Sequence, residues 1–318
     1  MIIKKIKRLR MVEWVANIIL LILISFIFYT TIPINTKKTI FVPKGSVSNI
    51  ITQMTKNGYM LNKIDKYILV LMGNPQYGWI SISNTTINRI DFLHQLVTGK
   101  AKMKSITLIP GETTDIFIAY LAKELNLNKI KLKHYLKIFS PYQEGGVYAD
   151  TYSVPLGINE KDLMKFLTSQ TNKKYEKLSN KIYGYYTIKK WNYIMTIASI
   201  IQKEAGSIKE MPLVASVIYN RLKKKMRLQM DGTLNYGKYS HIKVTPNRIK
   251  SDKSKFNTYK YKGIPPYPVC AVSIDAIKAS IKPSKTNYLY FMKNSKGKHD
   301  FSTTYKKHRE NIRKVKSI

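Results

Sequence analysis

One glutamate interrupts an otherwise regular helical pattern. In the stretch TIASIIQKEAG, from Thr196 to Gly206, Glu204 lies seven residues after Ile197 and three after Ile201, so it projects from the apolar side of the predicted helix. That apolar side repeats at i, i+3, i+4 and i+7 and comprises Ile194, Ile197, Ala198 and Ile201. The polar residues fall on the opposite side: Asn192, Thr196, Ser199 and Lys203.

This position suits Glu204 for acid chemistry. Gly206 is expected to end the helix, which leaves Glu204 in the last turn, where the helix dipole disfavours a negative charge by up to about 1 kcal/mol. Partial burial also disfavours the charged form. Both effects favour a carboxyl group that holds a proton near neutral pH, as a general acid must. The alternative is a structural Glu204 paired with a lysine or arginine at a domain edge.

The composition favours a polyanionic partner. Among the 318 residues there are 55 Lys and Arg against 18 Asp and Glu, a formal net charge of +37. Such a charge suits an anionic membrane surface, a wall polymer or nucleic acid, although an AT-rich coding bias explains the lysines equally well. No zinc-finger, aromatic RNA-binding or arginine-rich pattern supports nucleic acid, so we expect no nucleic-acid partner.

Metals and cofactors are not indicated by the sequence. Cys270 is the only cysteine, which excludes an internal disulfide, and the five histidines lack metal-ligand spacing. We expect neither a metal site nor a cofactor.

The N-terminus has the pattern of an uncleaved signal anchor. Residues 1–10 carry five positive charges, and an apolar run follows from about Val15 to Ile34. About 20 apolar residues match the bilayer core, and the end of the run offers no small-residue cleavage site. The basic side should remain in the cytoplasm. A buried core helix is the alternative.

The remainder predicts an α+β protein. Residues 39–100 read as strands and helices in a small unit that resembles LysM carbohydrate-binding modules in pattern alone. A strand at 106–109 and a helix capped by Thr114 or Asp115 open a second region. The stretch 144–155 reads as a Gly- and Tyr-rich loop, and residues 238–267 as a long loop lining a groove.

Several motifs after Glu204 have a specific order. They are ASIIQKE (198–204), VASVIYNRLKKKMRLQMDGT (214–233), FNTY (256–259), GIPPYPV (263–269), IKPSKTNYLYF (281–291) and HDFSTTYKKH (299–308). Together they resemble the endolytic murein transglycosylase, or YceG-like, family over about residues 35–315. The chain departs from the family pattern at Gln202, where a Glu is frequent, and at Gly232, where a Pro is frequent and where we expect a looser turn.

The resemblance implies that Glu204 is the catalytic residue. It also implies substrate-binding roles for five residues, whose amide, carboxylate and hydroxyl groups would bond sugars: Gln229, Asp231, Thr233, Asn257 and Tyr259. Asp231 as a simple turn-former is an equally open interpretation. Asn220 and Arg221 also match, with binding and helix-tying roles left equally open, and His299 and His308 are interpreted as structural or rim residues.

The implied activity is a lytic transglycosylase, a lyase acting on peptidoglycan. Glu204 would protonate the glycosidic oxygen, and the 6-hydroxyl of N-acetylmuramic acid would attack its own anomeric carbon, leaving a 1,6-anhydro end. A single carboxyl group suffices because the substrate supplies its own nucleophile, whereas ordinary glycosidases use two. The alternatives are a hydrolase of the same bond, with Asp231 as base, and a non-catalytic peptidoglycan-binding scaffold.

These expectations define a domain plan. Residues 1–11 form a cytoplasmic basic tail, 12–34 a transmembrane signal anchor, 35–105 a LysM-like α/β subdomain, and 106–318 a mixed α+β catalytic domain. The protein is expected to be single-pass in the inner membrane, with its catalytic domain periplasmic. Nascent glycan strands are the expected substrate, and peptidoglycan synthases the expected protein partners.

Overall fold

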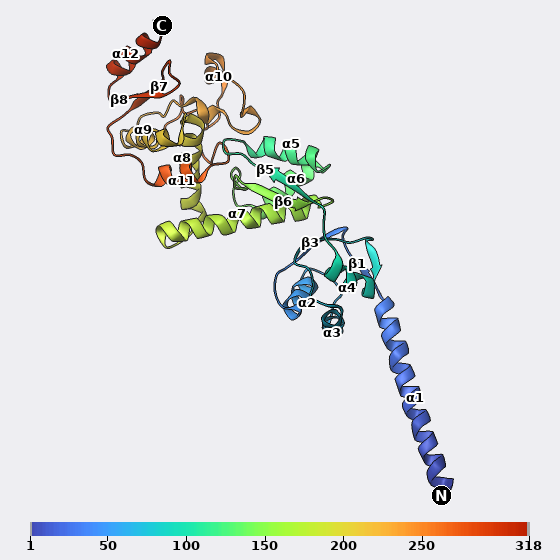
Figure 1. The fold of residues 1–318 in the computed structure, drawn as a ribbon. Coiled ribbons are helices and arrows are strands. Elements are labelled where there is room, and N and C mark those ends of the chain that lie inside the picture. Colours follow the sequence, from blue (N-terminus) through green and yellow to red (C-terminus); the bar gives the residue numbers. More distant parts are fainter. Residues whose placement is uncertain (1, 317–318) are drawn as a thin grey trace. The chain divides into compact units, whose positions relative to one another are not determined.

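The computed structural model describes residues 2–316 and contains both helices and short strands in two compact units (Figure 1). The first unit comprises residues 1–104 and 153–158, and the second comprises residues 105–152 and 159–318. The chain passes from one unit to the other within strands β5 (Met103–Thr107) and β6 (Thr151–Pro155). The mixed α+β class is therefore confirmed. The return of residues 153–158 to the first unit was not anticipated from the sequence.

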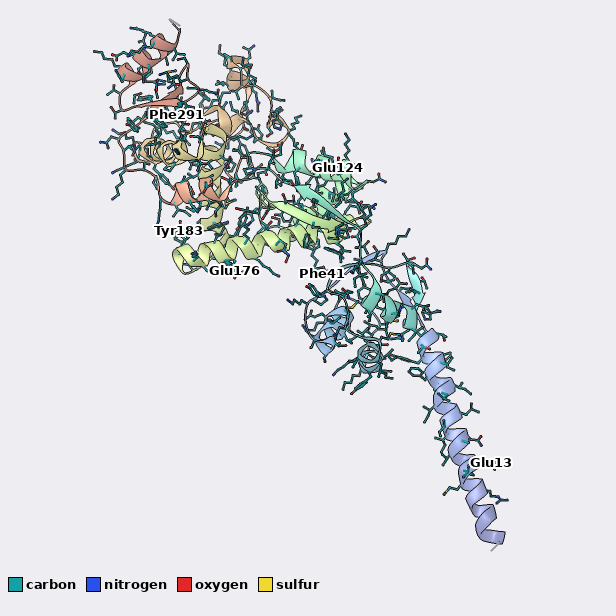
Figure 2. The ribbon with its side chains drawn as sticks, viewed as in Figure 1. Glu13, Phe41, Glu124, Glu176, Tyr183 and Phe291 are labelled. Carbon is teal, nitrogen blue, oxygen red and sulfur yellow. The ribbon has the colours of Figure 1, made fainter. Side chains whose placement is uncertain are left out.

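Helix α1 (Ile2–Thr31) contains the apolar run. Its segment Arg10–Thr31 has a mean hydropathy of 2.4 and is unburied, which fits a membrane span by length and composition. Glu13 projects from this helix close to its basic end (Figure 2). The helix stops at Thr31, three residues before the expected end of the anchor at residue 34, and Pro33–Asn35 forms strand β1. The anchor bounds themselves stay a prediction.

The rest of the first unit is built from two pairs of strands and three helices. Strand β1 pairs with β4 (Thr86–Asn88), and β2 (Thr39–Val42) pairs with β3 (Gly78–Ser81), both antiparallel. The helices are α2 (Val47–Lys56), α3 (Lys63–Met72) and α4 (Arg89–Thr98). Their apolar faces close one core that includes Ile34, Ile80 and Phe92. The LysM-like interpretation of this unit remains a prediction.

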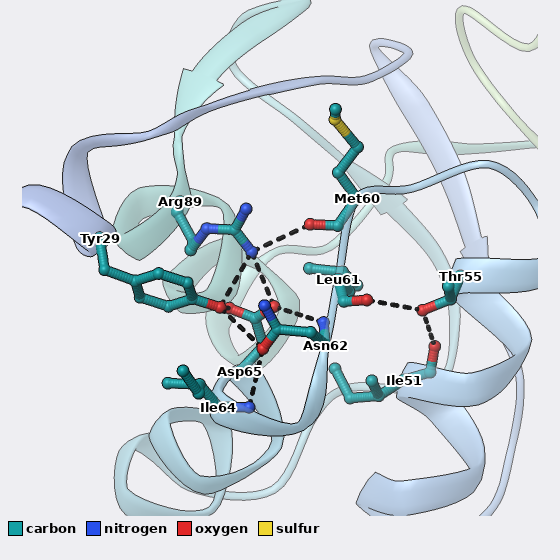
Figure 3. Close-up of polar contacts among 9 residues, drawn as sticks. All are labelled: Tyr29, Ile51, Thr55, Met60, Leu61, Asn62, Ile64, Asp65 and Arg89. Carbon is teal, nitrogen blue, oxygen red and sulfur yellow. Dashed lines mark hydrogen bonds and ion pairs between the residues drawn. The ribbon is translucent and has the colours of Figure 1, made fainter. Parts of the chain in front are cut away.

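A polar cluster ties the end of α1 to this unit (Figure 3). The Tyr29 hydroxyl lies 2.9 Å from oxygens of both Asn62 and Asp65. Arg89 forms a buried ion pair of 2.7 Å with Asp65 and also donates to the Met60 carbonyl. Asn62 and Asp65 form a capping box that starts α3. The helix therefore enters the first unit through fixed contacts, with only Ile32 between α1 and β1.

The second unit is mainly helical. Its larger helices are α5 (Thr114–Glu124), α6 (Lys129–Phe139), α7 (Glu160–Tyr183), α8 (Ile188–Glu204), α9 (Met211–Lys223), α11 (Ile274–Ile281) and α12 (Tyr305–Lys316). Strands β7 (Tyr290–Lys293) and β8 (His299–Ser302) form an antiparallel pair. The long helix α7 carries Glu176 and Tyr183 (Figure 2). Figure 1 shows α8, α9 and α11 grouped in this unit, and their buried residues share one core.

Helix α8 is buried on part of its polar side as well as on its apolar side. Thr196 and Ser199 were expected on an exposed face, but both are buried. Their hydroxyls donate to carbonyls of the preceding turn, and the Ser199 hydroxyl also accepts from the Val269 N–H at 2.9 Å. Local satisfaction of these hydroxyls removes the cost of burying them, so periodicity alone misjudged this face.

Two loop predictions were also too simple. The Gly- and Tyr-rich stretch contains strand β6, and the long stretch 238–267 contains helix α10 (Pro246–Ser251) as well as part of a short 3₁₀ turn, η3 (Gly237–Tyr239). Pro246 occupies the first turn of α10, where its missing N–H costs little, and Thr245 caps the helix by accepting from the Arg248 N–H.

Candidate active site

Glu204 is the last residue of α8, and its carboxyl group meets the loop that follows α9. Its Oε1 accepts a hydrogen bond of 2.7 Å from the N–H of Gly232, which lies in the 3₁₀ turn η2 (Asp231–Leu234). A Cβ at position 232 would lie 2.8 Å from this oxygen and 2.6 Å from Lys203 Cβ. In this chain, a side chain at position 232 would therefore force η2 or the end of α8 to shift. The expectation of a looser turn there stays a prediction.

The surroundings of Glu204 favour its protonated form. Burial raises the pKa of the carboxyl group to about 7, and the charge of Asp231 acts in the same direction, while the Gly232 hydrogen bond opposes both. Part of the side chain remains accessible, but the carboxyl group itself is surrounded by protein atoms, and this local environment governs its charge. At neutral pH both protonation states are populated, as proton donation followed by proton acceptance requires.

A second carboxylate lies beside the first. Asp231 is exposed, and its Oδ1 accepts a hydrogen bond of 2.7 Å from the Tyr259 hydroxyl. Burial raises the pKa of that hydroxyl, and the neighbouring charges of Asp231 and Glu204 raise it further. Tyr259 therefore remains a neutral donor that fixes the Asp231 carboxylate. The structure thus brings together three of the residues singled out in the sequence, Glu204, Asp231 and Tyr259.

Thr233 and Asn257 have a different place from the one expected. Both are fully buried. The Thr233 hydroxyl bonds the Met230 carbonyl and the Thr258 hydroxyl, and the Asn257 amide donates to the carbonyls of Ile249 and Asp252. Because their polar groups are engaged inside the protein, we revise their assignment from substrate contact to positioning of the loops.

Gln229 keeps an exposed side chain next to this site. Its backbone has φ of 51°, a left-handed conformation that is rare for residues other than glycine, and its N–H donates to the Thr258 carbonyl at 3.2 Å. Nothing in the sequence pointed to Thr258. This residue joins the two loops, because its hydroxyl also accepts from the Met230 N–H.

The comparisons with known proteins agree with the motifs. The family model described as YceG-like matches residues 40–314. The chain belongs to the YceG-like family. A YceG-like protein from Listeria monocytogenes has a solved structure that superposes with a TM-score of 0.58 at 26% identity, over 86% of this chain and 98% of that one.

Curated relatives of this YceG-like chain carry an enzymatic name. The chain is 36% identical to the endolytic murein transglycosylase of Bacillus subtilis over 152 residues. This match covers 46% of this chain and 40% of the relative. The chain is 31% identical to the endolytic murein transglycosylase of Streptococcus pneumoniae R6 over 179 residues. This match covers 53% of this chain and 31% of the relative. The matches therefore span less than half the length of these relatives.

Two residues that the sequence left open in this YceG-like chain act as ties within the fold. The Asn220 amide donates to the carbonyls of Thr286 and Tyr288. The Arg221 guanidinium donates to the Leu289 carbonyl at 2.6 Å and is buried. These bonds hold α9 to the segment leading into β7, which favours the helix-tying interpretation.

The histidine at the start of β8 anchors the turn after α8. Glu210 bonds the His299 ring at 2.8 Å, accepts from the His299 N–H, and accepts from the Gly206 N–H at 3.0 Å. His308 stacks on Tyr290 in the neighbouring α12–β7 contact. These contacts support structural roles for both histidines.

Proposed function

We propose that this chain is a membrane-anchored endolytic murein transglycosylase. The observation that carries the proposal is Glu204, a carboxyl group with a pKa of about 7 at the end of a buried helix, next to the exposed Asp231. The names of the curated relatives support the substrate class. The bond proposed for cleavage joins C1 of N-acetylmuramic acid to the oxygen of N-acetylglucosamine within nascent glycan strands, and its cleavage would help to end strand elongation.

In the proposed reaction, Glu204 acts first as acid and then as base. The protonated carboxyl group gives its proton to the glycosidic oxygen as the C1–O bond breaks. The 6-hydroxyl of the same muramyl residue forms a new bond to C1, and its proton passes to the Glu204 carboxylate. The products are a free N-acetylglucosamine end and a 1,6-anhydro-muramyl end. No water is consumed, and Glu204 returns to its starting state.

The neighbouring groups have supporting roles in this proposal. Asp231, held by Tyr259, places a negative charge where positive charge develops at C1 in the transition state. The same charge raises the pKa of Glu204, which keeps the acid protonated. Gln229, with its exposed amide, is proposed to bond sugar hydroxyl or acetamido groups.

A hydrolase of the same bond is the second candidate, and the exposed Asp231 favours it. In that reaction Asp231 would activate a water molecule that attacks C1. Mass spectrometry of products formed in heavy-oxygen water separates the two reactions. Anhydro ends without label support the transglycosylase, whereas labelled reducing ends would assign the reaction to the hydrolase.

A non-catalytic peptidoglycan-binding scaffold is the remaining alternative. On this alternative the wild-type chain binds strands without cleaving them, and Glu204→Gln binds them equally well. The transglycosylase proposal instead predicts that the variant binds strands but no longer cleaves them. Purified glycan strands provide the substrate for both measurements.

The placement at the membrane is part of the proposal. The helix Arg10–Thr31 is proposed to span the cytoplasmic membrane once, with the basic N-terminus inside and both compact units outside, where strands are polymerised. The first unit is proposed to serve as the LysM-like glycan-binding module, and peptidoglycan synthases as neighbours in the membrane.

A further inference from the structure

A cavity of about 620 Å³ in the second unit contains a buried carboxyl group that the proposed reaction does not use. The carboxyl group belongs to Glu144, whose side chain is 6% exposed. The cavity is lined by charged, amide and aromatic side chains, among them Glu144, Lys137, Gln143, Tyr142, Tyr236 and Tyr267.

The two oxygens of Glu144 differ in their contacts. Oε1 accepts from the N–H and hydroxyl of Thr114, at the start of α5, and from the Gly145 N–H. Oε2 accepts no hydrogen bond from any residue that the structure describes, although Glu144 lines the cavity. One oxygen therefore caps a helix, and the other is left to accept from a ligand.

The walls suit an amino sugar. Tyrosine rings such as Tyr267 offer apolar faces against which sugar rings stack, and the free Glu144 oxygen accepts from a hydroxyl or an acetamido N–H. Lys137 is exposed and has no ion pair among the described residues, so it suits a ligand carboxylate. Lys133, by contrast, is already paired with Asp115.

The cavity is also connected to the proposed site through the chain. Tyr236 follows the turn η2 by two residues, and the Gly237 carbonyl accepts from the Thr113 hydroxyl at 2.7 Å, which fixes this rim to the start of α5. We propose that this cavity is a saccharide subsite that binds an N-acetylated sugar of the strand through Glu144 and its lactyl or peptide carboxylate through Lys137. This inference rests on the proposed function, because the ligand of the subsite is part of the same glycan strand.

Calorimetry in the full chain carrying Glu204→Gln tests the subsite without cleavage. Glu144→Gln keeps an oxygen for Thr114 but replaces the free acceptor with a donor, so we expect strand fragments to bind about tenfold more weakly. Glu160→Gln is the matched control, because Glu160 also accepts a backbone N–H, that of Asn128 at 2.9 Å, but lies outside the cavity. The affinity of the Glu160→Gln chain for strand fragments should not change.

A second variant keeps the test independent of folding. Lys137→Ala removes an exposed side chain and should weaken binding of muramyl-containing strands severalfold while leaving N-acetylglucosamine oligomers unaffected. Unchanged strand affinity in Glu144→Gln and Lys137→Ala overturns the subsite and leaves the proposed function standing. If the Glu204→Gln chain binds no strands at all, the proposed substrate is wrong and the subsite falls with it.

An independent feature of the first unit is the exposed apolar side of α3. Three large side chains recur there at i, i+3 and i+7, and each is at least 49% exposed: Ile64, Tyr67 and Leu71. Lysines flank them at positions 63 and 66. An apolar stripe edged by lysines is typical of helices that lie in a membrane interface.

The position of α3 identifies what covers this stripe. Asn62, which starts α3, bonds the hydroxyl of Tyr29, in the last turns of the span Arg10–Thr31 (Figure 3). Tyrosines at this position in a span lie at the level of the lipid headgroups. The start of α3 is therefore fixed at the bilayer surface, and Figure 1 shows α3 on the side of the first unit from which α1 extends.

We infer that the α3 stripe rests on the lipid surface and fixes the first unit against the membrane. Single cysteines carrying an environment-sensitive fluorophore test this in the full chain with Cys270→Ala, reconstituted in vesicles of phosphatidylethanolamine and phosphatidylglycerol. We expect a label at Leu71→Cys to shift to the blue and to be quenched by shallow spin-labelled lipid. A label at Asn84→Cys, in the loop at the end of the β1–β4 pair remote from α1, should show neither effect.

A label at Leu20→Cys, within the proposed span, reports whether α1 is inserted. Quenching at position 20 without quenching at position 71 overturns the α3 inference and leaves the anchor in place. Absence of quenching at position 20 shows that the anchor itself is wrong, and the inference then fails with it.

Discussion

At the scale of single residues, the site depends on how two carboxyl groups share one environment. Burial and the charge of Asp231 raise the pKa of Glu204, and Tyr259 holds Asp231 in place. In the proposed reaction the two groups have separate roles: Glu204 carries the proton, and Asp231 supplies negative charge.

Replacement of Glu204 by glutamine should abolish the chemistry and spare the fold. Glutamine is nearly isosteric and still accepts from the Gly232 N–H, but it carries no acidic proton. We expect cleavage of glycan strands to fall by at least about a hundredfold. Near-normal cleavage by the folded variant would show that Glu204 is not the acid.

The same variant has a stability signature that depends on pH. The pKa of Glu204 is about 7 in the folded chain against 4.5 for an unperturbed carboxyl group. Above pH 4.5 the unfolded chain loses this proton first, so the glutamate destabilises the fold increasingly up to pH 7, by at most about 3 kcal/mol. In thermal denaturation, the stability of Glu204→Gln relative to the wild type should therefore increase between pH 5 and pH 8. An unchanging difference contradicts the raised pKa.

Asp231→Asn should move the alkaline limb of the activity profile. Cleavage requires protonated Glu204 and should decline above about pH 7. Removal of the Asp231 charge lowers the pKa of Glu204, so the decline should begin at a lower pH in the variant. Rates measured across pH 5–9 test this. An alkaline limb at the same pH in both chains would show that the Asp231 charge does not affect the pKa of Glu204.

Tyr259→Phe should lower cleavage severalfold with little change in thermal midpoint, because only the hydroxyl that fixes Asp231 is lost. Tyr261→Phe is the matched control in the same loop, since its hydroxyl bonds the Lys253 carbonyl and not the site. Equal effects in the two variants would mean that the loop responds to any lost hydroxyl.

At the scale of elements, the site exists because the end of α8 meets η2. The α8 helix is buried around much of its surface, and η2 approaches its last turn so closely that a Cβ at position 232 would force one of the two segments to shift. Thr258 and the buried Asn257 hold the two neighbouring loops in place.

Gly232→Ala tests this contact. The added Cβ would clash with Lys203 Cβ and the Glu204 carboxyl group, which we expect to cost about 1–3 kcal/mol of unfolding free energy and most of the activity. Gly206→Ala is the milder control, because its Cβ would come no closer than 3.1 Å to any atom, the Glu210 carboxylate, and would meet His299 and Gly297 only at ordinary contact distance. Denaturant titration and strand cleavage measure the two effects; a fully active Gly232→Ala chain would refute the close-contact argument.

At the scale of the whole molecule, one apolar helix is joined directly to a folded unit. Tyr29, Asp65 and Arg89 join α1 to the first unit through fixed contacts. The net charge of +37 suits a position near anionic lipid and wall polymer.

This arrangement predicts the topology of the chain. A reporter enzyme that works only outside the cytoplasm should be active when fused after Ile318, because the basic N-terminus is retained inside. Activity of a strictly cytoplasmic reporter at the same position would reverse the orientation. A fusion before Met1 supplies the opposite control.

The sequence by itself determined the apolar span, the mixed α+β class, the helix that ends at Glu204 and the family motifs, because these depend on local periodicity and on residue order. Only the tertiary structure decided which polar residues face solvent. Thr233, Asn257 and Ser199 carry the same groups as substrate-binding residues, yet each is bonded inside the protein. Thr233 and Ser199 bond segments distant in sequence, and Asn257 bonds carbonyls within its own irregular loop, so helical or strand periodicity does not reveal their burial. The Gly232 contact and the open oxygen of Glu144 arise in the same way, from segments that meet only when the chain is folded.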